Sequence, residues 1–478
     1  MKRLTKTFNN DFEKMRVKFD LNNMFEEKVG KEHGISKEDI NKLKVEVKSA
    51  HQTLLDKRKN AELGFMDLPY KENVTQEILD YVEQNKSKFE NIVVLGIGGS
   101  ALGMIALQKA LNPYYYNERE ELRKGNPKLY VLDNVDPGWF GEFLENIDIS
   151  KTIFNVISKS GGTAETMTEF LIVRKHLEDE LGEKASEHLV FTTSRNRGNL
   201  IKIAKSENIK CFFIPENVGG RFSVLSPVGL LPAAFVGIDI EELLAGARYM
   251  DQICNKADIW NNPAYLNAAL QYLAYQDGKI MSVIMPYSTA LSRISDWYVQ
   301  LWAESLGKRI NRDGELINVG PTPVKAVGPT DQHSQVQLYI EGPYDKIVTF
   351  LEVKKYKREV AIPKKYREIP SISYLGGHTM NKLIKVEKKA TELALTKNNR
   401  LNCTILIPEI NPFTLGQLIQ FYELQTAFAG ELFNINAFNQ PGVEMGKNYT
   451  YGILGRKGYE EMNKEFKNRQ EKNQDLIL

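Results

Sequence analysis

The chain has 478 residues, of which 42% are hydrophobic and 26% charged, and its formal net charge is +2. This length and composition are typical of a globular protein with two or three domains and large cores. Near-neutral charge argues against nucleic acid as a partner, because nucleic-acid binding normally requires a basic face. Three widely spaced cysteines (Cys211, Cys254 and Cys403) do not make a disulfide framework and favour a reducing compartment.

Residues 1–90 are rich in charge and lack a strong strand pattern, so we expect an N-terminal helical segment. The start of the chain has no apolar core of the kind found in signal peptides. The longest apolar run, Val228 to Ile238, has 11 residues and contains Pro232, which makes it too short to span a bilayer. We therefore expect a cytoplasmic protein with no membrane partner.

Residues 91–240 alternate short apolar runs with helix-length stretches, the pattern of a parallel sheet with right-handed crossovers. We expect a first α/β domain here, with ligands bound at the carboxyl ends of its strands. The predicted strands are Ile92–Ile97, Leu129–Asp133, Ile153–Ile157, Leu189–Thr193 and Cys211–Ile214.

The first of these strands ends in a glycine-rich turn, Val93 to Gly103, which precedes a helical pattern. Its glycines do not have the G-x-G-x-x-G spacing of a dinucleotide site, although Asp133 lies where a ribose-binding acid is expected. A nucleotide site therefore stays open as an alternative. A small phosphorylated ligand fits at least as well, because a second glycine turn follows in the same sheet.

That second turn, Ser158 to Thr163, ends the third predicted strand and combines hydroxyl-bearing residues, Lys159 and two glycines. The unpaired amides and the dipole at the following helix N-terminus favour a phosphate, and Lys159 adds a full positive charge. An ordinary β–α turn is the alternative, since glycine turns are common.

Arg221 lies in a tight turn of small residues, Val218 to Pro227. Arginine is always charged and presents a rigid fork of donors, which suits a developing oxyanion. The alternative is an arginine that binds a loop carbonyl.

A second, less regular α/β pattern covers residues 241–440. Its predicted helix, Leu291–Leu306, is apolar except for a narrow polar stripe that includes Gln300 and Glu304, which are neighbours on one face. The stripe faces either water or a cleft, and in a cleft Glu304 would be suited to act as a base. The predicted strands are Ile280–Met285, Ile347–Val353 and Thr404–Ile407.

Two further segments carry candidate groups. His333 lies in a polar, turn-forming stretch, where it could transfer protons near neutral pH or have no role. Lys447 follows Glu444 by three residues, so a surface ion pair is the alternative to a role in chemistry. Residues 441–478 are expected to form a C-terminal helix and tail. No cysteine pair or His-Glu-x-x-His spacing predicts a metal site.

Together these motifs resemble the glucose-6-phosphate isomerase (phosphoglucose isomerase) family, in the family's order from about Gly96 to Lys447. The most specific segments are Asn217–Gly229 and Gly430–Lys447, and Gln300–Lys308 and Thr330–Gln335 resemble the family's two catalytic segments. The resemblance implies an α/β fold of two doubly wound sugar isomerase (SIS) domains with parallel-rich sheets, plus helical N-terminal and C-terminal extensions. It also implies a sugar phosphate substrate, no cofactor or metal, and a homodimer.

The reaction implied is the interconversion of glucose 6-phosphate and fructose 6-phosphate. By matching positions, Glu304 moves the proton between C1 and C2, and His333, lent by the partner subunit, opens the sugar ring. Lys447 assists at the ring oxygen, and Arg221 stabilises the enediolate. The implied substrate contacts are Gly99, Ser100, Gln300 and Gln440, with a phosphate cradle of Ser158, Lys159, Ser160 and Thr163.

Two alternatives stay open. One is a non-catalytic sugar-phosphate sensor, because SIS domains also serve in regulators and Gly34 to Leu43 faintly resembles a helix-turn-helix unit. The other is an isomerase that also accepts mannose 6-phosphate, because the choice between the two sugars depends on fine details of the pocket.

Overall fold

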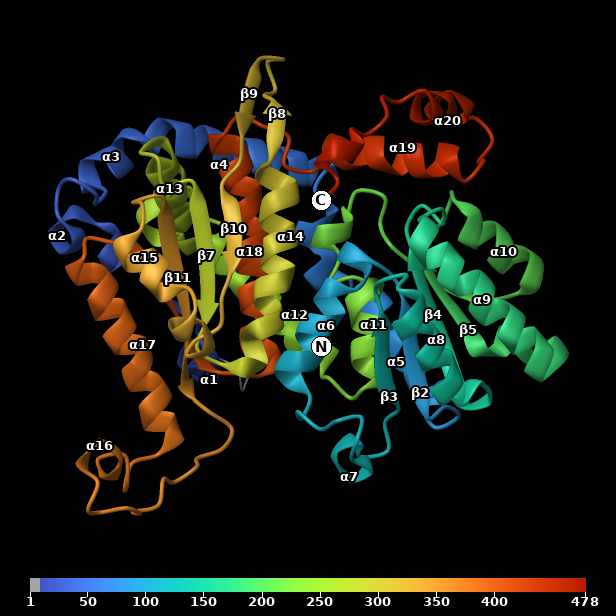
Figure 1. Ribbon diagram of the computed structural model, residues 1–478, viewed down its shortest axis with the longest axis horizontal. Helices are drawn as coiled ribbons and strands as arrows, with labels where there is room; N and C mark the ends of the chain where they lie inside the picture. Colours follow the sequence, from blue (N-terminus) through green and yellow to red (C-terminus); the bar gives the residue numbers. More distant parts are fainter. Residues whose placement is uncertain (1–8) are drawn as a thin grey trace.

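The computed structural model describes residues 9–478, which form two five-stranded sheets, each with helices on both faces, and a separate two-stranded hairpin (Figure 1). The first sheet has five parallel strands in the order β3-β2-β4-β5-β6. Every residue of β2, β4 and β5 is buried, which explains their continuous apolar runs. All five strands were predicted to within two residues: β2 Asn91–Leu95, β3 Lys128–Leu132, β4 Thr152–Ser158, β5 Leu189–Thr193 and β6 Lys210–Phe213.

Helices cover both faces of this sheet. One face packs on α8 (Pro137–Asn146), α9 (Ala164–Leu181) and α10 (Asn199–Glu207). The other packs on α5 (Glu72–Asn85), α6 (Leu102–Leu111) and α11 (Pro227–Phe235). The chain passes from β2 to β3 on one side of β2 and then to β4 on the other side. The carboxyl ends of β2 and β4 therefore form the switch point of this sheet.

The second sheet has the order β1-β12-β11-β7-β10, with β1 antiparallel and the other strands parallel. Three of its strands were predicted: β7 (Met281–Pro286), β11 (Lys346–Lys355) and β12 (Asn402–Glu409). The sequence did not reveal β1 (Lys18–Asp20), β10 (Thr322–Lys325) or the hairpin of β8 (Lys308–Ile310) and β9 (Leu316–Val319).

The two sheets share one large core. α12 (Ile240–Cys254), α13 (Pro263–Gln276), α14 (Ser292–Leu306) and α18 (Pro412–Leu432) pack into the same cluster of buried side chains as α6 and α11. α12 and α18 approach closely, since a Cβ at Gly246 would lie 1.8 Å from the carbonyl oxygen of Phe413. α15 (Val336–Glu341) and α17 (Met380–Lys397) cover the other face of the second sheet.

The remaining helices lie at the periphery. They are α1 (Asn9–Lys14), α2 (Glu26–Val29), α3 (Lys37–Lys42), α4 (Lys44–Lys59), α7 (Glu120–Arg123), α16 (Pro370–Ser373), α19 (Glu444–Ile453) and α20 (Glu460–Lys467). Within residues 9–478, no helix is both long and apolar enough to cross a membrane. The domain boundaries stay predictions, and β1 shows that the N-terminal segment contributes to the second sheet.

Candidate active site

The two glycine turns of the first sheet lie side by side at its switch point. β2 and β4 are paired in parallel with Leu95 opposite Val156, so the turns that follow them leave the same edge. A Cβ at Gly96 would lie 3.4 Å from the side chain of Ile157. The first turn continues as a short helical turn over Gly98–Ser100, and the second leads into α9.

The predicted phosphate cradle is a compact set of hydroxyls and amides. Ser158 Oγ lies 3.0 Å from Thr163 Oγ1, and the Gly161 amide donates to Ser158 Oγ at 3.1 Å. The Gly162 amide donates to Ser160 Oγ at 3.2 Å. Thr163 precedes α9 and its side chain makes no capping hydrogen bond. The arrangement therefore places hydroxyls beside the N-terminus of α9, which suits an anion.

The side chain of Lys159 is held by two backbone carbonyls beside this cradle. Its Nζ donates to the carbonyl oxygens of Glu216 at 2.7 Å and Val218 at 2.9 Å. Burial lowers the pKa of Lys159 from its ordinary value. Lys159 therefore fixes the segment that leads into the Arg221 loop, in addition to any charge it offers a ligand.

The Arg221 loop lies directly on the first glycine turn. A Cβ at Gly99 would be 2.2 Å from the backbone carbonyl carbon of Gly220, so only glycine fits there. Ser223 Oγ donates to the Gly220 carbonyl oxygen at 2.6 Å and lies 3.3 Å from that of Gly99. This close approach aligns Arg221 with the edge of the sheet.

Arg221 is almost completely buried and joins three parts of the chain. Its Nη1 donates to Glu304 Oε2 at 3.2 Å and to Gln440 Oε1 at 3.0 Å. Its Nε donates to Ser305 Oγ at 2.7 Å. Nη2 donates to two backbone carbonyls, those of Ala437 at 2.6 Å and Asn439 at 3.2 Å. Arg221 therefore binds loop carbonyls, as the alternative interpretation expects, and it also contacts the candidate base, while its role at an oxyanion stays a prediction.

Glu304 is on the polar stripe of α14 and reaches the surface rather than the core. Its side chain is 31% exposed. Gln300, one turn earlier, lies with Nε2 at 3.5 Å from Glu304 Oε1. The same Nε2 would lie 3.1 Å from a Cβ placed on Gly98. Gln300 thus connects the candidate base with the first glycine turn.

Sequence reasoning missed Lys308, which lies at the end of α14. Its Nζ donates to the carbonyl oxygens of Glu304 at 2.6 Å and Ser305 at 2.9 Å. Burial, with a smaller effect of nearby Arg221, lowers the pKa of Lys308 to about 8. Its place at the end of the motif Gln300–Lys308 was the one signal in the sequence.

α19 extends the site from the C-terminal segment. Lys447 lies 3.0 Å from Glu444 Oε1, and both side chains are about half exposed, so the predicted ion pair is present. Tyr451, four residues after Lys447 and hence on the same face, donates from its hydroxyl to the Gly162 carbonyl oxygen at 3.3 Å. Lys447 is therefore on the helix face that meets the phosphate cradle.

His333 is not close to Glu304 within one chain. β10 runs parallel to β7, and His333 follows β10 in the turn Thr330–His333. α14 returns antiparallel after β7, so its first residues, not Glu304, lie at that edge. Lys325, at the end of β10, pairs with Asp296 in the first turns of α14. From Ser292 to Glu304 the helix spans about 18 Å. His333 is exposed and lies at the Ser292 end of the helix, away from Glu304.

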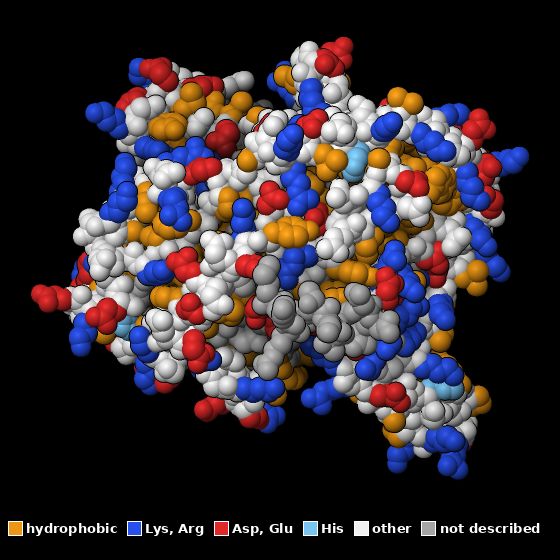
Figure 2. All heavy atoms as spheres, turned by 180° about the vertical axis from the view of Figure 1, so that it is seen from behind, with side chains coloured by type: hydrophobic (Ala, Val, Ile, Leu, Met, Phe, Trp, Pro, Cys, Tyr) orange, Lys and Arg blue, Asp and Glu red, His pale blue; other side chains and the backbone are white. Residues whose placement is uncertain are grey.

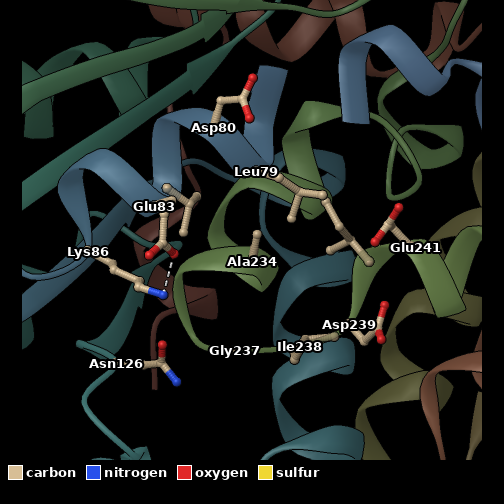
Figure 3. Close-up of a pocket in the computed structure, with 12 residues that line it drawn as sticks. Leu79, Asp80, Glu83, Lys86, Asn126, Ala234, Gly237, Ile238, Asp239 and Glu241 are labelled. Atoms are coloured by element: carbon tan, nitrogen blue, oxygen red, sulfur yellow. Dashed lines mark ion pairs between the residues drawn. The ribbon is translucent and has the colours of Figure 1, made fainter. Parts of the chain in front are cut away.

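A different cavity lies at the opposite edge of the first sheet. It has a volume of about 450 Å³ and lies between α5, α11 and α12, near Asn126, which precedes β3 (Figure 3). Lys86 pairs with Glu83 there at 2.5 Å. The lining contains four carboxylates, Asp80, Glu83, Asp239 and Glu241. Such a lining repels phosphate, so this cavity does not suit a phosphate ligand.

The fold and the site together define an α/β protein of the sugar isomerase type. The family model described as phosphoglucose isomerase matches residues 72–471. The chain belongs to the phosphoglucose isomerase family.

Known relatives agree along most of their length. The chain is 51% identical over 452 residues to the glucose-6-phosphate isomerase of Carboxydothermus hydrogenoformans, covering 94% of this chain and 97% of the relative. Identity to the glucose-6-phosphate isomerase of Rubrobacter xylanophilus is 42%, with 93% and 99% covered.

Two crystal structures show the same architecture. One, of a hypothetical protein from Thermus thermophilus, has a TM-score of 0.82 at 39% identity and covers 92% of this chain and all of that one. The other, of a glucose-6-phosphate isomerase from Chlamydia trachomatis, has a TM-score of 0.71 at 26% identity, with 83% and 76% covered.

Proposed function

We propose that the cleft at the carboxyl edge of the first sheet interconverts D-glucose 6-phosphate and D-fructose 6-phosphate. One observation carries the proposal: a partly exposed carboxylate, Glu304, is paired with the buried guanidinium of Arg221 at 3.2 Å beside two glycine turns. The family and the named relatives support this reaction. They lend no support to a non-catalytic sensor or to a wider choice of sugars.

The phosphate of the substrate binds in the cradle of Ser158, Ser160 and Thr163, at the start of α9. It takes no part in the chemistry. Its binding energy holds C1 and C2 of the sugar against Glu304, so that contacts remote from the reacting carbons are converted into alignment. Gly99, Ser100, Gln300 and Gln440 border the sugar between the cradle and Glu304.

The proton transfer uses Glu304 as base and then as acid. In the open-chain aldose, Glu304 removes the proton from C2, and the electron pair shifts to give an enediolate with negative charge on its oxygen. Arg221 Nη1, already fixed by its other hydrogen bonds, stabilises that charge. A proton passes from the C2 hydroxyl to the C1 oxygen, and Glu304 returns its own proton to C1 as the C2 carbonyl forms, which gives the ketose with no net loss of atoms or charge.

Ring opening requires a proton at the ring oxygen, and we assign it to His333 with assistance from Lys447. Because His333 lies at the start of α14, and about 18 Å of helix separates Ser292 from Glu304, it cannot serve the cleft of its own chain. A homodimer in which each chain lends His333 to its partner resolves this separation. The three free cysteines fit a cytoplasmic location.

Mixed dimers test the shared site. Glu304→Gln and His333→Ala chains are each expected to be nearly inactive alone. When the two are unfolded together and refolded at equal amounts, half of the dimers are mixed, and each mixed dimer has one site with both native residues. Activity should therefore recover to about a quarter of wild type. Absence of recovery, with mixed dimers demonstrated by mass spectrometry, would remove His333 from a shared site.

A further inference from the structure

A second cavity, of about 770 Å³, lies at the carboxyl edge of the second sheet. We propose that it binds a nucleoside triphosphate. The end of α6, the loop after it, the turn before α14 and the end of β11 line the cavity. The polar and aromatic members of the lining are Lys109, Asn112, Tyr114, Tyr115, Arg119, Ser288, Lys355, Tyr356, Lys357 and Arg358.

The cavity occupies the switch point of its sheet. β7 has β10 on one side and β11 on the other, all parallel, so the carboxyl ends of β7 and β11 are where open α/β sheets bind ligands. Ser288 follows β7, and Lys355 ends β11. The proposed phosphate cradle holds the equivalent place in the first sheet, between β2 and β4.

The charge of the lining selects an anion. Five cationic side chains border the cavity, and none of the described residues that line it is Asp or Glu. Lys357 donates from Nζ to the Leu111 carbonyl oxygen at 3.2 Å, which draws the two edges of the cavity together. Lys355 has only a long contact, 3.4 Å, with Glu409 outside the lining. On the back of the molecule Lys and Arg side chains also gather near the root of the projection that contains α16 (Figure 2). Several cations around one cavity suit a polyphosphate better than a single phosphate.

Aromatic rings add a second requirement. Tyr114 and Tyr115 are 60% and 66% exposed, so their rings are accessible to a ligand in the cavity. Lys109 Nζ lies 5.2 Å from the centre of the Tyr114 ring. The Tyr356 hydroxyl donates to the Tyr287 carbonyl oxygen at 2.7 Å, which fixes the third ring. Exposed rings beside cations are suited to stacking a base while its phosphates are neutralised.

The cavity is separate from the catalytic cleft. α6 starts at Leu102, beside the turn Gly98–Ser100, and its last residues line the cavity about 15 Å away. α14 starts beside Ala290, which lines the cavity, and carries Glu304 near its other end. Figure 1 shows both helices between the two sheets. A ligand in this cavity therefore contacts the far ends of the two helices that border the cleft.

Calorimetric titration of the full chain with ATP in EDTA tests the proposal. We expect one ATP per chain, with a dissociation constant that saturating fructose 6-phosphate changes by less than about threefold. The variant Lys109→Ala/Arg358→Ala should weaken ATP at least about tenfold, whereas Lys48→Ala, an exposed lysine of α4, should not. Tyr114→Ala should weaken ATP but leave tripolyphosphate binding unchanged.

Each of four results would overturn the proposal: no ATP binding, displacement of ATP by fructose 6-phosphate, equal binding by the double variant, or binding of tripolyphosphate as tight as that of ATP. Circular dichroism and isomerase activity of each variant confirm its fold. Lys355→Ala, a side chain that is 80% exposed, provides an independent cation variant. Isomerase activity without ATP binding contradicts this site and leaves the catalytic assignment intact.

Discussion

Arg221 holds Glu304 with a single nitrogen, Nη1, while its other donors are occupied by Ser305 and two backbone carbonyls. A guanidinium fixed in this way does not have to reorganise when negative charge develops on the substrate. Preorganised donors of this kind typically supply a few kcal/mol of transition-state stabilisation. The same bonds also fix the loop Ala437–Gln440 against α14.

Arg221→Lys should therefore affect both rate and stability. A lysine cannot make the Nε and Nη2 hydrogen bonds, so Ser305 and the Ala437 carbonyl lose their donors in a buried site. We expect kcat/KM to fall by roughly 10²–10³ and the free energy of unfolding by about 1–3 kcal/mol. Steady-state kinetics and urea unfolding measure the two effects. Arg367→Lys, an exposed arginine near α16, is the control, and equal behaviour of the two variants would contradict the assignment.

Much of the architecture could be predicted from the sequence. Eight strands were identified because buried parallel strands are continuous apolar runs. β1 was missed because it has three residues, of which only Phe19 is apolar, and its pairing with β12 is decided by tertiary contact. β10 was missed because Pro323 disfavours a strand, yet β10 is an edge strand, where proline is tolerated.

The candidate site was predictable as a list of residues and not as an arrangement. Motif order indicated Glu304 and Arg221, but nothing in the sequence places their side chains 3.2 Å apart. The backbone carbonyls that Lys159 binds carry no signal in the sequence, because every residue has one. The separation of His333 from Glu304 depends on the direction of α14 relative to β10, which only the topology fixes.

Lys159→Met is expected to act twice. It removes a positive charge near the phosphate cradle and also releases the segment Glu216–Val218 that precedes Arg221. We expect the inhibition constant of a sugar-phosphate analogue to rise about tenfold, equivalent to about 1.4 kcal/mol, together with a fall in kcat. Inhibition kinetics compare it with Lys184→Met, an exposed lysine outside the cradle. An unchanged inhibition constant would contradict a role in phosphate binding.

Glu169 of α9 should make the stability depend on pH. Its side chain is buried, its Oε1 has no hydrogen-bond partner among the described residues, and burial, then Asp133 and Glu165, raises its pKa to about 8. Because the folded-state pKa of Glu169 exceeds its unfolded value of 4.5, the contribution of Glu169 to stability is fully present below pH 4.5 and is lost as pH rises through 8.

Glu169→Gln should remove this loss. Between pH 5 and pH 9 the free energy of unfolding of the wild type should fall by roughly 2–4 kcal/mol more than that of the variant. Urea unfolding at several pH values measures the difference. Glu180→Gln, an exposed residue of the same helix, should follow the wild type, and a Glu169→Gln profile parallel to that of the wild type would show that Glu169 is ionised in the folded protein.

The central claim is that the carboxylate of Glu304 moves the proton between C2 and C1. The most direct measurement is exchange of the C2 hydrogen of glucose 6-phosphate with deuterium from solvent, followed by NMR. We predict that Glu304→Gln slows exchange by at least about 10²–10⁴-fold while sugar-phosphate binding is retained, and that Glu46→Gln, an exposed glutamate of α4, exchanges at the wild-type rate. Exchange at the wild-type rate in the Glu304→Gln chain would contradict the account.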